Sequence, residues 1–129
     1  LETISEHPRI VVDVAHNPDG WKAALDEVRH RTAGTLYVAV GVMRDKDLDA
    51  LCDLLSAYDV VALPVGLPSE RAFTTEELRS LLSQRGNSVM EVGDVQEALS
   101  WFGTHASVGD TLLVTGSHFT VEAALKTLL

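Results

Sequence analysis

A carboxylate, an imidazole and an amide stand close together directly after an apolar run near the start of the chain. The run is Ile10-Val11-Val12, and the polar residues are Asp13, His16 and Asn17. Pro18 and an amphipathic segment follow, an order that predicts a strand, a tight polar turn and a helix. In α/β proteins, ligands commonly bind at junctions of this kind. The stretch is therefore a candidate ligand site, provided that the rest of the chain supplies a matching sheet.

Taken singly, each polar residue also has a purely structural interpretation. Asp13 can hydrogen-bond the turn after its strand, His16 can be a solvated histidine, and Asn17 is better explained as a helix cap. The run Asp45-Lys46-Asp47 is, on spacing alone, a charged loop with a cap for the next helix, and Ser117 can simply cap the final helix. A functional interpretation therefore depends on whether these residues come together.

Apolar runs and amphipathic stretches alternate along the whole chain. Residues 2–4 form a possible edge strand, and stronger strands are expected at 9–14, 35–42, 58–63, 88–92 and 110–114. Stretches with apolar residues at helical spacing follow each of these five strands, and the third begins with the capping-box pair Thr74 and Glu77. The pattern predicts one α/β domain over residues 1–129. We expect three layers and a Rossmann-like, mostly parallel sheet of five to six strands, flanked by about five helices.

In a parallel sheet, the loops that lead from strands into helices all emerge at one edge. The unusual polar residues of this chain fall in those loops: Asp13, His16, Asn17, Arg44, Asp45, Lys46, Arg71, Ser117 and His118. Helix N-termini at that edge present backbone N–H groups, which favour anions. The sequence thus predicts one polar ligand-binding edge, without naming the ligand.

The composition limits the classes of partner. Hydrophobic residues make up 46% of the chain and charged residues 22%, which is ordinary globular usage and disfavours disorder. Ten Lys and Arg against nineteen Asp and Glu give a net charge of −9, which argues against nucleic acid or an anionic membrane as partner. No apolar run approaches the ~20 residues of a membrane span.

Several kinds of site have no signature in this sequence. The P-loop pattern G-x-x-x-x-G-K-[ST], the dinucleotide fingerprint G-x-G-x-x-G, the esterase elbow G-x-S-x-G and the spacing of zinc ligands are all missing, so no metal site is expected. The single cysteine, Cys52, cannot form an internal disulfide, which fits a cytoplasmic location. Because the chain begins with Leu1 and not Met, we expect it to be a piece of a longer protein.

Three motifs in this order resemble one family. They are Asp13-Val14-Ala15-His16-Asn17-Pro18, then Gly41-Val42-Met43-Arg44-Asp45-Lys46-Asp47, then Thr115-Gly116-Ser117-His118-Phe119-Thr120-Val121. Together they resemble the C-terminal domain of folylpolyglutamate synthase, often also dihydrofolate synthase, of the Mur ligase superfamily. The Asp-Asn-Pro-Arg motif typical of the diaminopimelate-adding Mur ligase does not occur here, which favours folate over peptidoglycan.

The resemblance implies an ATP-dependent ligase that joins L-glutamate to folate or dihydropteroate through an acyl phosphate. The family's P-loop ATPase domain lies N-terminal to this one and is the expected partner within the same polypeptide. ATP is the expected cofactor, with Mg²⁺ bound outside this chain. On this basis the domain alone is expected to be inactive.

The resemblance also implies roles for individual residues. Asp13 and Asn17 are expected to contact ATP, and His16 is expected to act in catalysis, facing the transferring phosphate or the glutamate. Ser117 is expected near the glutamate as well. Three further residues are expected at the edge of the site: Lys46, Arg71 and His118.

Other functions remain open on the residues alone. The chain could be the C-terminal domain of another Mur-type amino-acid ligase, or a binding module without chemistry. A phosphoacceptor receiver is a further five-stranded α/β domain of similar length. A receiver needs an Asp at the end of the third strand and a Lys after the fifth strand. These places hold Leu63-Pro64 and Thr115-Gly116-Ser117, which disfavours a receiver.

Overall fold

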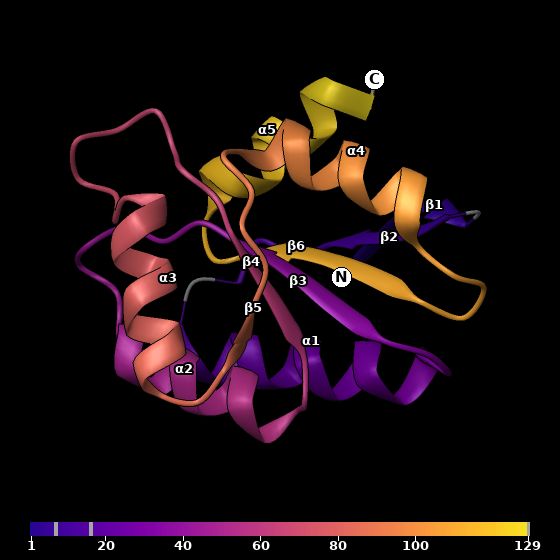
Figure 1. The fold of residues 1–129 in the computed structure, drawn as a ribbon, viewed down its shortest axis with the longest axis horizontal. Coiled ribbons are helices and arrows are strands. Elements are labelled where there is room, and N and C mark those ends of the chain that lie inside the picture. The colour runs from indigo at the N-terminus through magenta and orange to yellow at the C-terminus, as the bar shows by residue number, and fades with distance from the viewer. Residues whose placement is uncertain (7, 16, 129) are drawn as a thin grey trace.

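The computed structural model describes residues 1–6, 8–15 and 17–128. Strands and helices alternate along the chain (Figure 1) in the order β1 (Glu2–Glu6), β2 (Arg9–Val12), α1 (Pro18–Arg31), β3 (Leu36–Val40), α2 (Leu48–Ala57), β4 (Val61–Pro64), α3 (Thr75–Gln84), β5 (Ser88–Val89), α4 (Val95–His105), β6 (Thr111–Thr115) and α5 (His118–Leu128). In the described part of the chain, no helix is both long and apolar enough to cross a membrane.

The strands form one six-stranded sheet in the order β1-β2-β6-β3-β4-β5. All neighbouring pairs are parallel except β1 and β2, which pair in antiparallel fashion with an irregularity between Thr3 and Ser5. The predicted mostly parallel α/β fold is therefore confirmed, including the edge strand near the start of the chain. The connections place β6, the last strand in sequence, at the centre beside β2 and β3.

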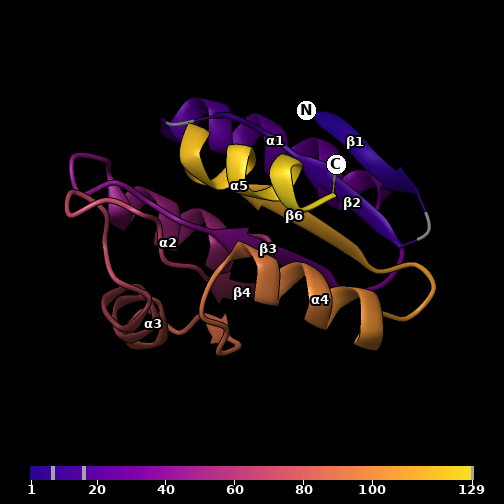
Figure 2. The ribbon, with the colours of Figure 1, turned by 90° about the horizontal axis from the view of Figure 1, so that it is seen from above.

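Helices cover both faces of the sheet and make the three layers (Figures 1 and 2). On one face, α1, α2 and α3 pack Trp21, Leu51 and Leu78 against Val38 and other strand residues. On the other face, α4 and α5 form a second core with Ala39, Leu63 and Val114 among the strand residues. Because both faces are covered, all five residues of β6 are buried, as expected for the interior of a parallel sheet.

Four strands are shorter than the sequence predicts: β2 ends at Val12 and not at residue 14, β3 covers Leu36–Val40 and not 35–42, and β4 and β5 are shortened as well. The run 88–92 contains only the two-residue β5, because the chain turns away after Met90 and Gly93 meets the β4–α3 loop, where its carbonyl accepts the Gly66 N–H at 3.1 Å. The strand expected at 58–63 begins at Val61, because Asp59 adopts a left-handed turn with φ of 53° after α2. The change in β5 lies at its carboxyl end, beside the β4–α3 loop, and the change in β4 lies at its amino end, away from the predicted ligand edge.

Candidate functional site at the carboxyl edge of the sheet

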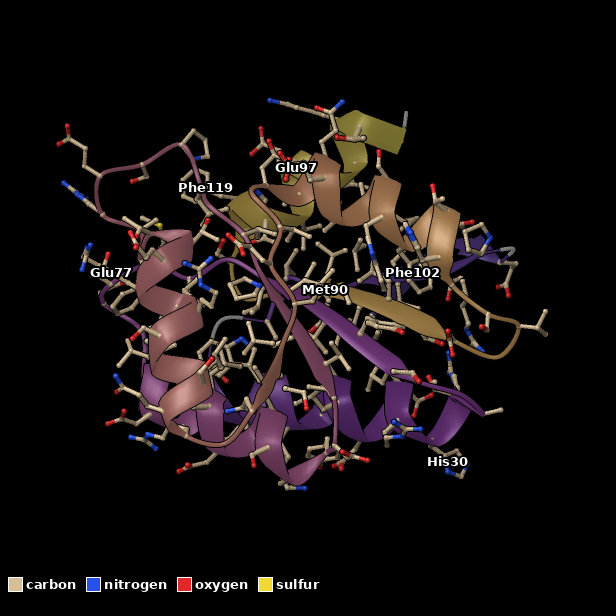
Figure 3. All side chains as sticks on the ribbon, viewed as in Figure 1. His30, Glu77, Met90, Glu97, Phe102 and Phe119 are labelled. Carbon is tan, nitrogen blue, oxygen red and sulfur yellow. The ribbon has the colours of Figure 1, made fainter. Side chains whose placement is uncertain are left out.

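A pocket of about 580 Å³ lies where four strand-to-helix loops meet, beyond the carboxyl ends of β2, β3, β4 and β6. The loops after β3 and β4 extend side by side at this end of the molecule, and Figure 3 shows Phe119 at the start of α5 facing the same region. The pocket is lined by Val14, Met43, Arg44, Asp45, Lys46, Glu70, Arg71, Ser117, His118 and Phe119. Segments far apart in sequence therefore meet at the predicted edge.

Six of the seven residues singled out as site candidates lie in the described part of the chain. Lys46, Arg71, Ser117 and His118 line this pocket together. The other two, Asp13 and Asn17, line an adjacent hollow of about 430 Å³, and Val14 lines both. His16, the expected catalytic residue, falls outside the described residues.

Asp13 is held at the junction of β2 and β6. Its backbone N–H donates to the Val114 carbonyl and its own carbonyl accepts the Thr115 hydroxyl, each at 3.1 Å. The carboxylate Oδ1 accepts a hydrogen bond from the Leu1 nitrogen at 3.1 Å, whereas Oδ2 is buried with no partner among the described residues. A buried carboxylate oxygen is costly to leave unpaired, so this atom is suited to accept a hydrogen bond from a ligand.

Asn17 is the N-cap of α1, as one interpretation of the sequence predicts. Its Oδ1 accepts the Gly20 N–H at 2.9 Å, and Pro18 occupies the first turn. The indole Nε1 of Trp21 donates to the Ala15 carbonyl at 3.0 Å and ties the loop to the helix. The start of α1 is thus fixed beside Asp13, where its N–H groups favour an anion.

Ser117 is buried, with 3% of its surface exposed, and it acts as a cap for α5. Its Oγ accepts the Thr120 N–H at 3.2 Å and lies 2.9 Å from the Thr120 hydroxyl, which donates to the Gly41 carbonyl at 2.9 Å. Since the Thr120 hydroxyl has a single hydrogen, Ser117 must be the donor between the two hydroxyls. One lone pair of Ser117 then remains for a ligand.

Cationic groups outnumber anionic groups in the pocket lining. Lys46 is partly buried and lies 3.8 Å from the exposed Asp45 carboxylate, while Asp47 caps α2 by accepting the Ala50 N–H at 3.0 Å. Among the described residues, no acidic side chain forms an ion pair with Arg71. This lining, with the N-terminus of α5, suits a small anion that carries carboxylate or phosphate groups.

Arg44 and Glu77 form an ion pair at the pocket's edge that sequence reasoning missed. Arg44 Nη1 donates to Glu77 Oε2 at 2.9 Å, and the Arg44 guanidinium lies 5.2 Å from the centre of the Phe73 ring. The guanidinium, together with the Thr74 N–H, lowers the pKa of Glu77 from 4.5 to about 2. Glu77 was identifiable only as a capping residue, because no local pattern indicates that α3 begins beside the loop after β3.

Possible metal ligands are scattered over the described part of the chain. Within residues 1–6, 8–15 and 17–128, no three His, Cys, Asp or Glu side chains come together as a possible metal site. The donors that line the pocket, which are N–H, hydroxyl, ammonium and guanidinium groups, can bind and orient anionic groups.

Comparison with known proteins gives a consistent family. Residues 1–118 match the family model described as "Mur ligase, glutamate ligase domain". The chain is 32% identical over 138 residues to the folylpolyglutamate synthase of Lacticaseibacillus casei, covering 100% of this chain and 29% of that protein. It is 30% identical over 131 residues to the UDP-N-acetylmuramyl-tripeptide synthetase of Deinococcus radiodurans, covering 94% of this chain and 27% of that protein.

Solved structures give the same result. The structure described as "E.coli FolC in complex with DHPP and ADP" superposes with a TM-score of 0.85 at 27% identity, over 98% of this chain and 30% of that one. A Mycobacterium tuberculosis folylpolyglutamate synthase complexed with ADP superposes with a TM-score of 0.85 at 25% identity, over 99% of this chain and 31% of that one. The chain thus spans about 30% of the length of these relatives. The fold, the three motifs and these matches together establish that the chain belongs to the Mur ligase, glutamate ligase domain family, as its resemblance to folylpolyglutamate synthases predicts.

Proposed function

We propose that residues 1–129 form the C-terminal domain of an ATP-dependent ligase that adds L-glutamate to folate or dihydropteroate. The observation that carries the proposal is the meeting of the family's motifs around one cation-lined pocket at the carboxyl edge of the sheet. The E. coli relative has been solved with DHPP and ADP, and a Yersinia pestis relative with AMPPNP and a Mn ion. Such ligands on relatives support a nucleotide-dependent reaction for a polypeptide that carries this domain.

The proposed reaction has two steps. A carboxylate oxygen of the folate substrate attacks the γ-phosphorus of ATP, which gives an acyl phosphate and releases ADP. The glutamate amine then attacks the acyl carbon, an amide bond forms, phosphate leaves with the C–O bonding electrons, and the amine loses a proton. We propose that the P-loop and the Mg²⁺ ligands belong to the N-terminal domain of the same polypeptide, so that this chain has no activity alone.

In this proposal the pocket holds the incoming glutamate. Lys46 and Arg71 are positioned to pair with its carboxylates, and Ser117 with the first turn of α5 offers an oxygen and N–H groups. Holding an amine beside an acyl phosphate in the correct orientation can supply up to ~7–11 kcal/mol of the barrier reduction. The contribution of this chain is therefore mainly positioning.

The adjacent hollow is proposed as the nucleotide side of the site. Asp13 Oδ2, buried and without a partner among the described residues, would accept a hydrogen bond from the nucleotide, and Asn17 fixes the start of α1 beside it. His16 is proposed to face the transferring phosphate or the glutamate. The single cysteine is buried, and we propose the reducing cytoplasm as the location.

The test is an assay of the ligase polypeptide that carries this domain. Incubation with ATP, L-glutamate and either dihydropteroate or a reduced folate should release ADP and give a product heavier by one glutamyl unit, detected by mass spectrometry. The 129-residue chain in the same assay should give none. Absence of product from the ligase polypeptide with both acceptors would exclude the proposal, and turnover by the chain alone would exclude its inactivity.

The 30% identity to the D. radiodurans UDP-N-acetylmuramyl-tripeptide synthetase supports a second candidate, a ligase that adds an amino acid to a cell-wall precursor. The same ADP assay, repeated with a UDP-muramyl acceptor and a panel of amino acids, separates the two. Turnover only with the UDP-muramyl acceptor would favour this second candidate.

A further inference from the structure

We propose that Arg44 is a positioning residue for Arg71. Through its ion pair with Glu77, Arg44 holds Arg71 at the pocket, and Arg71 binds a carboxylate of the amino-acid substrate. The identity of that substrate rests on the proposed function. The arrangement of the two loops rests on contacts that are independent of it.

The loops after β3 and β4 pair with each other along their backbones. The Arg44 N–H donates to the Arg71 carbonyl at 2.7 Å, and the Phe73 N–H donates to the Val42 carbonyl at 2.9 Å. Between these bonds, Met43 and Ala72 form an antiparallel bridge. The backbone of Arg71 is therefore fixed directly to the backbone of Arg44.

The side chain of Arg44 adds a second attachment, to the start of α3. Its guanidinium holds both carboxylate oxygens of Glu77 and lies over Phe73. Glu77 is itself fixed, because its Oε1 accepts the Thr74 N–H at 3.0 Å while its backbone N–H donates to the Thr74 hydroxyl at 3.1 Å. The planar fork of arginine suits such two-point pairing, which a lysine ammonium cannot reproduce.

Because of these contacts, the two neighbouring arginines, Arg44 and Arg71, have different roles. The charge of Arg44 is neutralised by Glu77. Arg71 also lines the pocket, but within the described part of the chain its guanidinium forms no ion pair. Its backbone carbonyl accepts the Arg44 N–H, and its N–H donates to the Ser69 hydroxyl at 3.1 Å. Without the Arg44 side chain, this long loop loses its attachment to the start of α3 and keeps only backbone bonds and the local turn around Ser69, and ordering a residue costs about 1–2 kcal/mol in backbone entropy. The consequence is a preordered cation for a carboxylate.

The test compares Arg44→Ala, Arg44→Lys, Arg71→Ala and the double variant in the ligase polypeptide. The control is Arg85→Ala. Arg85 also pairs with two carboxylates, Asp49 and Asp53, and joins the far end of α3 to α2. The control removes a comparable ion pair from the same helix without touching the pocket.

The expected result is a rise in KM for glutamate with kcat and the KM for ATP nearly unchanged. Arg44→Ala should raise it roughly ten- to hundredfold, because a displaced Arg71 loses charge-assisted hydrogen bonds to the carboxylate, and Arg44→Lys should give an intermediate value. The double variant should be no worse than Arg71→Ala, because Arg44 acts through Arg71. Arg85→Ala should leave the KM unchanged even if the melting temperature falls.

An unchanged KM in Arg44→Ala, or effects of Arg44→Ala and Arg71→Ala that multiply in the double variant, would overturn the proposal. Amide hydrogen exchange of the 129-residue chain tests the positioning role of Arg44 independently of the proposed function. If the ligase polypeptide has no glutamate-dependent turnover, the proposed function fails, and faster exchange at the Phe73 N–H in Arg44→Ala but not in Arg85→Ala still supports the positioning role. Equal exchange rates in wild type and Arg44→Ala would overturn that role as well.

Discussion

Gly116 lies so close to Gly41 that a Cβ atom on Gly116 would stand 2.5 Å from the Gly41 carbonyl oxygen. Gly116 also has φ of 108°, which side chains rarely tolerate. Two of the three family motifs therefore meet backbone to backbone where β3 and β6 end. This contact sets the distance between the loop that carries Lys46 and the turn that carries Ser117.

Gly116→Ala should destabilise the fold by roughly 2–3 kcal/mol, since it combines backbone strain with a steric clash. Chemical denaturation monitored by circular dichroism measures the change. The matched control is Gly103→Ala within α4, where a Cβ meets nothing within 4 Å and φ is not positive. That substitution should be neutral or stabilise by up to about 1 kcal/mol. Equal effects of the two substitutions would contradict the steric argument.

The Thr120 hydroxyl should matter for stability more than its methyl group. Thr120 is fully buried, and its hydroxyl donates to the Gly41 carbonyl while accepting a hydrogen bond from the Ser117 hydroxyl. Thr120→Val leaves the Gly41 carbonyl and the Ser117 hydroxyl without this partner, at an expected cost of about 1–3 kcal/mol. Thr120→Ser keeps the hydroxyl and should cost less. A larger loss in the serine variant than in the valine variant would show that packing of the methyl dominates.

Local patterns predict the elements of this fold because their signals lie within a few residues. The pair Thr74 and Glu77 predicts a capping box, and both of its hydrogen bonds are present. The parallel alternation also predicts that Lys46, Arg71 and Ser117 reach one edge, as they do. These inferences need only residue type and spacing.

Features that depend on strand order could not be predicted in the same way. The Arg44–Glu77 pair joins residues 33 positions apart and requires that the loops after β3 and β4 lie side by side. The separation of Asp13 from the main pocket depends on how Val14 projects between two hollows. The shortness of β5 depends on a contact between Gly93 and Gly66, and no pattern around residue 90 indicates it.

Cys52 should resist alkylation in the folded protein. It is 1% exposed on the buried face of α2, and burial raises the pKa of its thiol, so that little thiolate is present. Iodoacetamide near pH 8, followed by intact mass, should modify the chain only when urea is added. The control is Val108→Cys with Cys52→Ala, since residue 108 is fully exposed and its thiol should react at once. Rapid native-state modification of Cys52 would contradict its buried position.

Glu77 should remain ionised far into the acid range because Arg44 pairs with it. Its pKa is lowered to about 2 from 4.5, so ionised Glu77 stabilises the fold fully above pH 4.5, and this contribution disappears as the pH falls from 4.5 through 2. The Cδ chemical shift of Glu77 in a pH titration measures the value directly. In Arg44→Ala the pKa should rise toward 4.5, whereas Arg85→Ala should leave it low, because Arg85 pairs with Asp49 and Asp53 instead. A Glu77 pKa near 4.5 in the unmodified chain would mean that the Arg44–Glu77 pair is not held in solution, and the ordering of the β4–α3 loop would then depend on its backbone bonds and on the turn at Ser69.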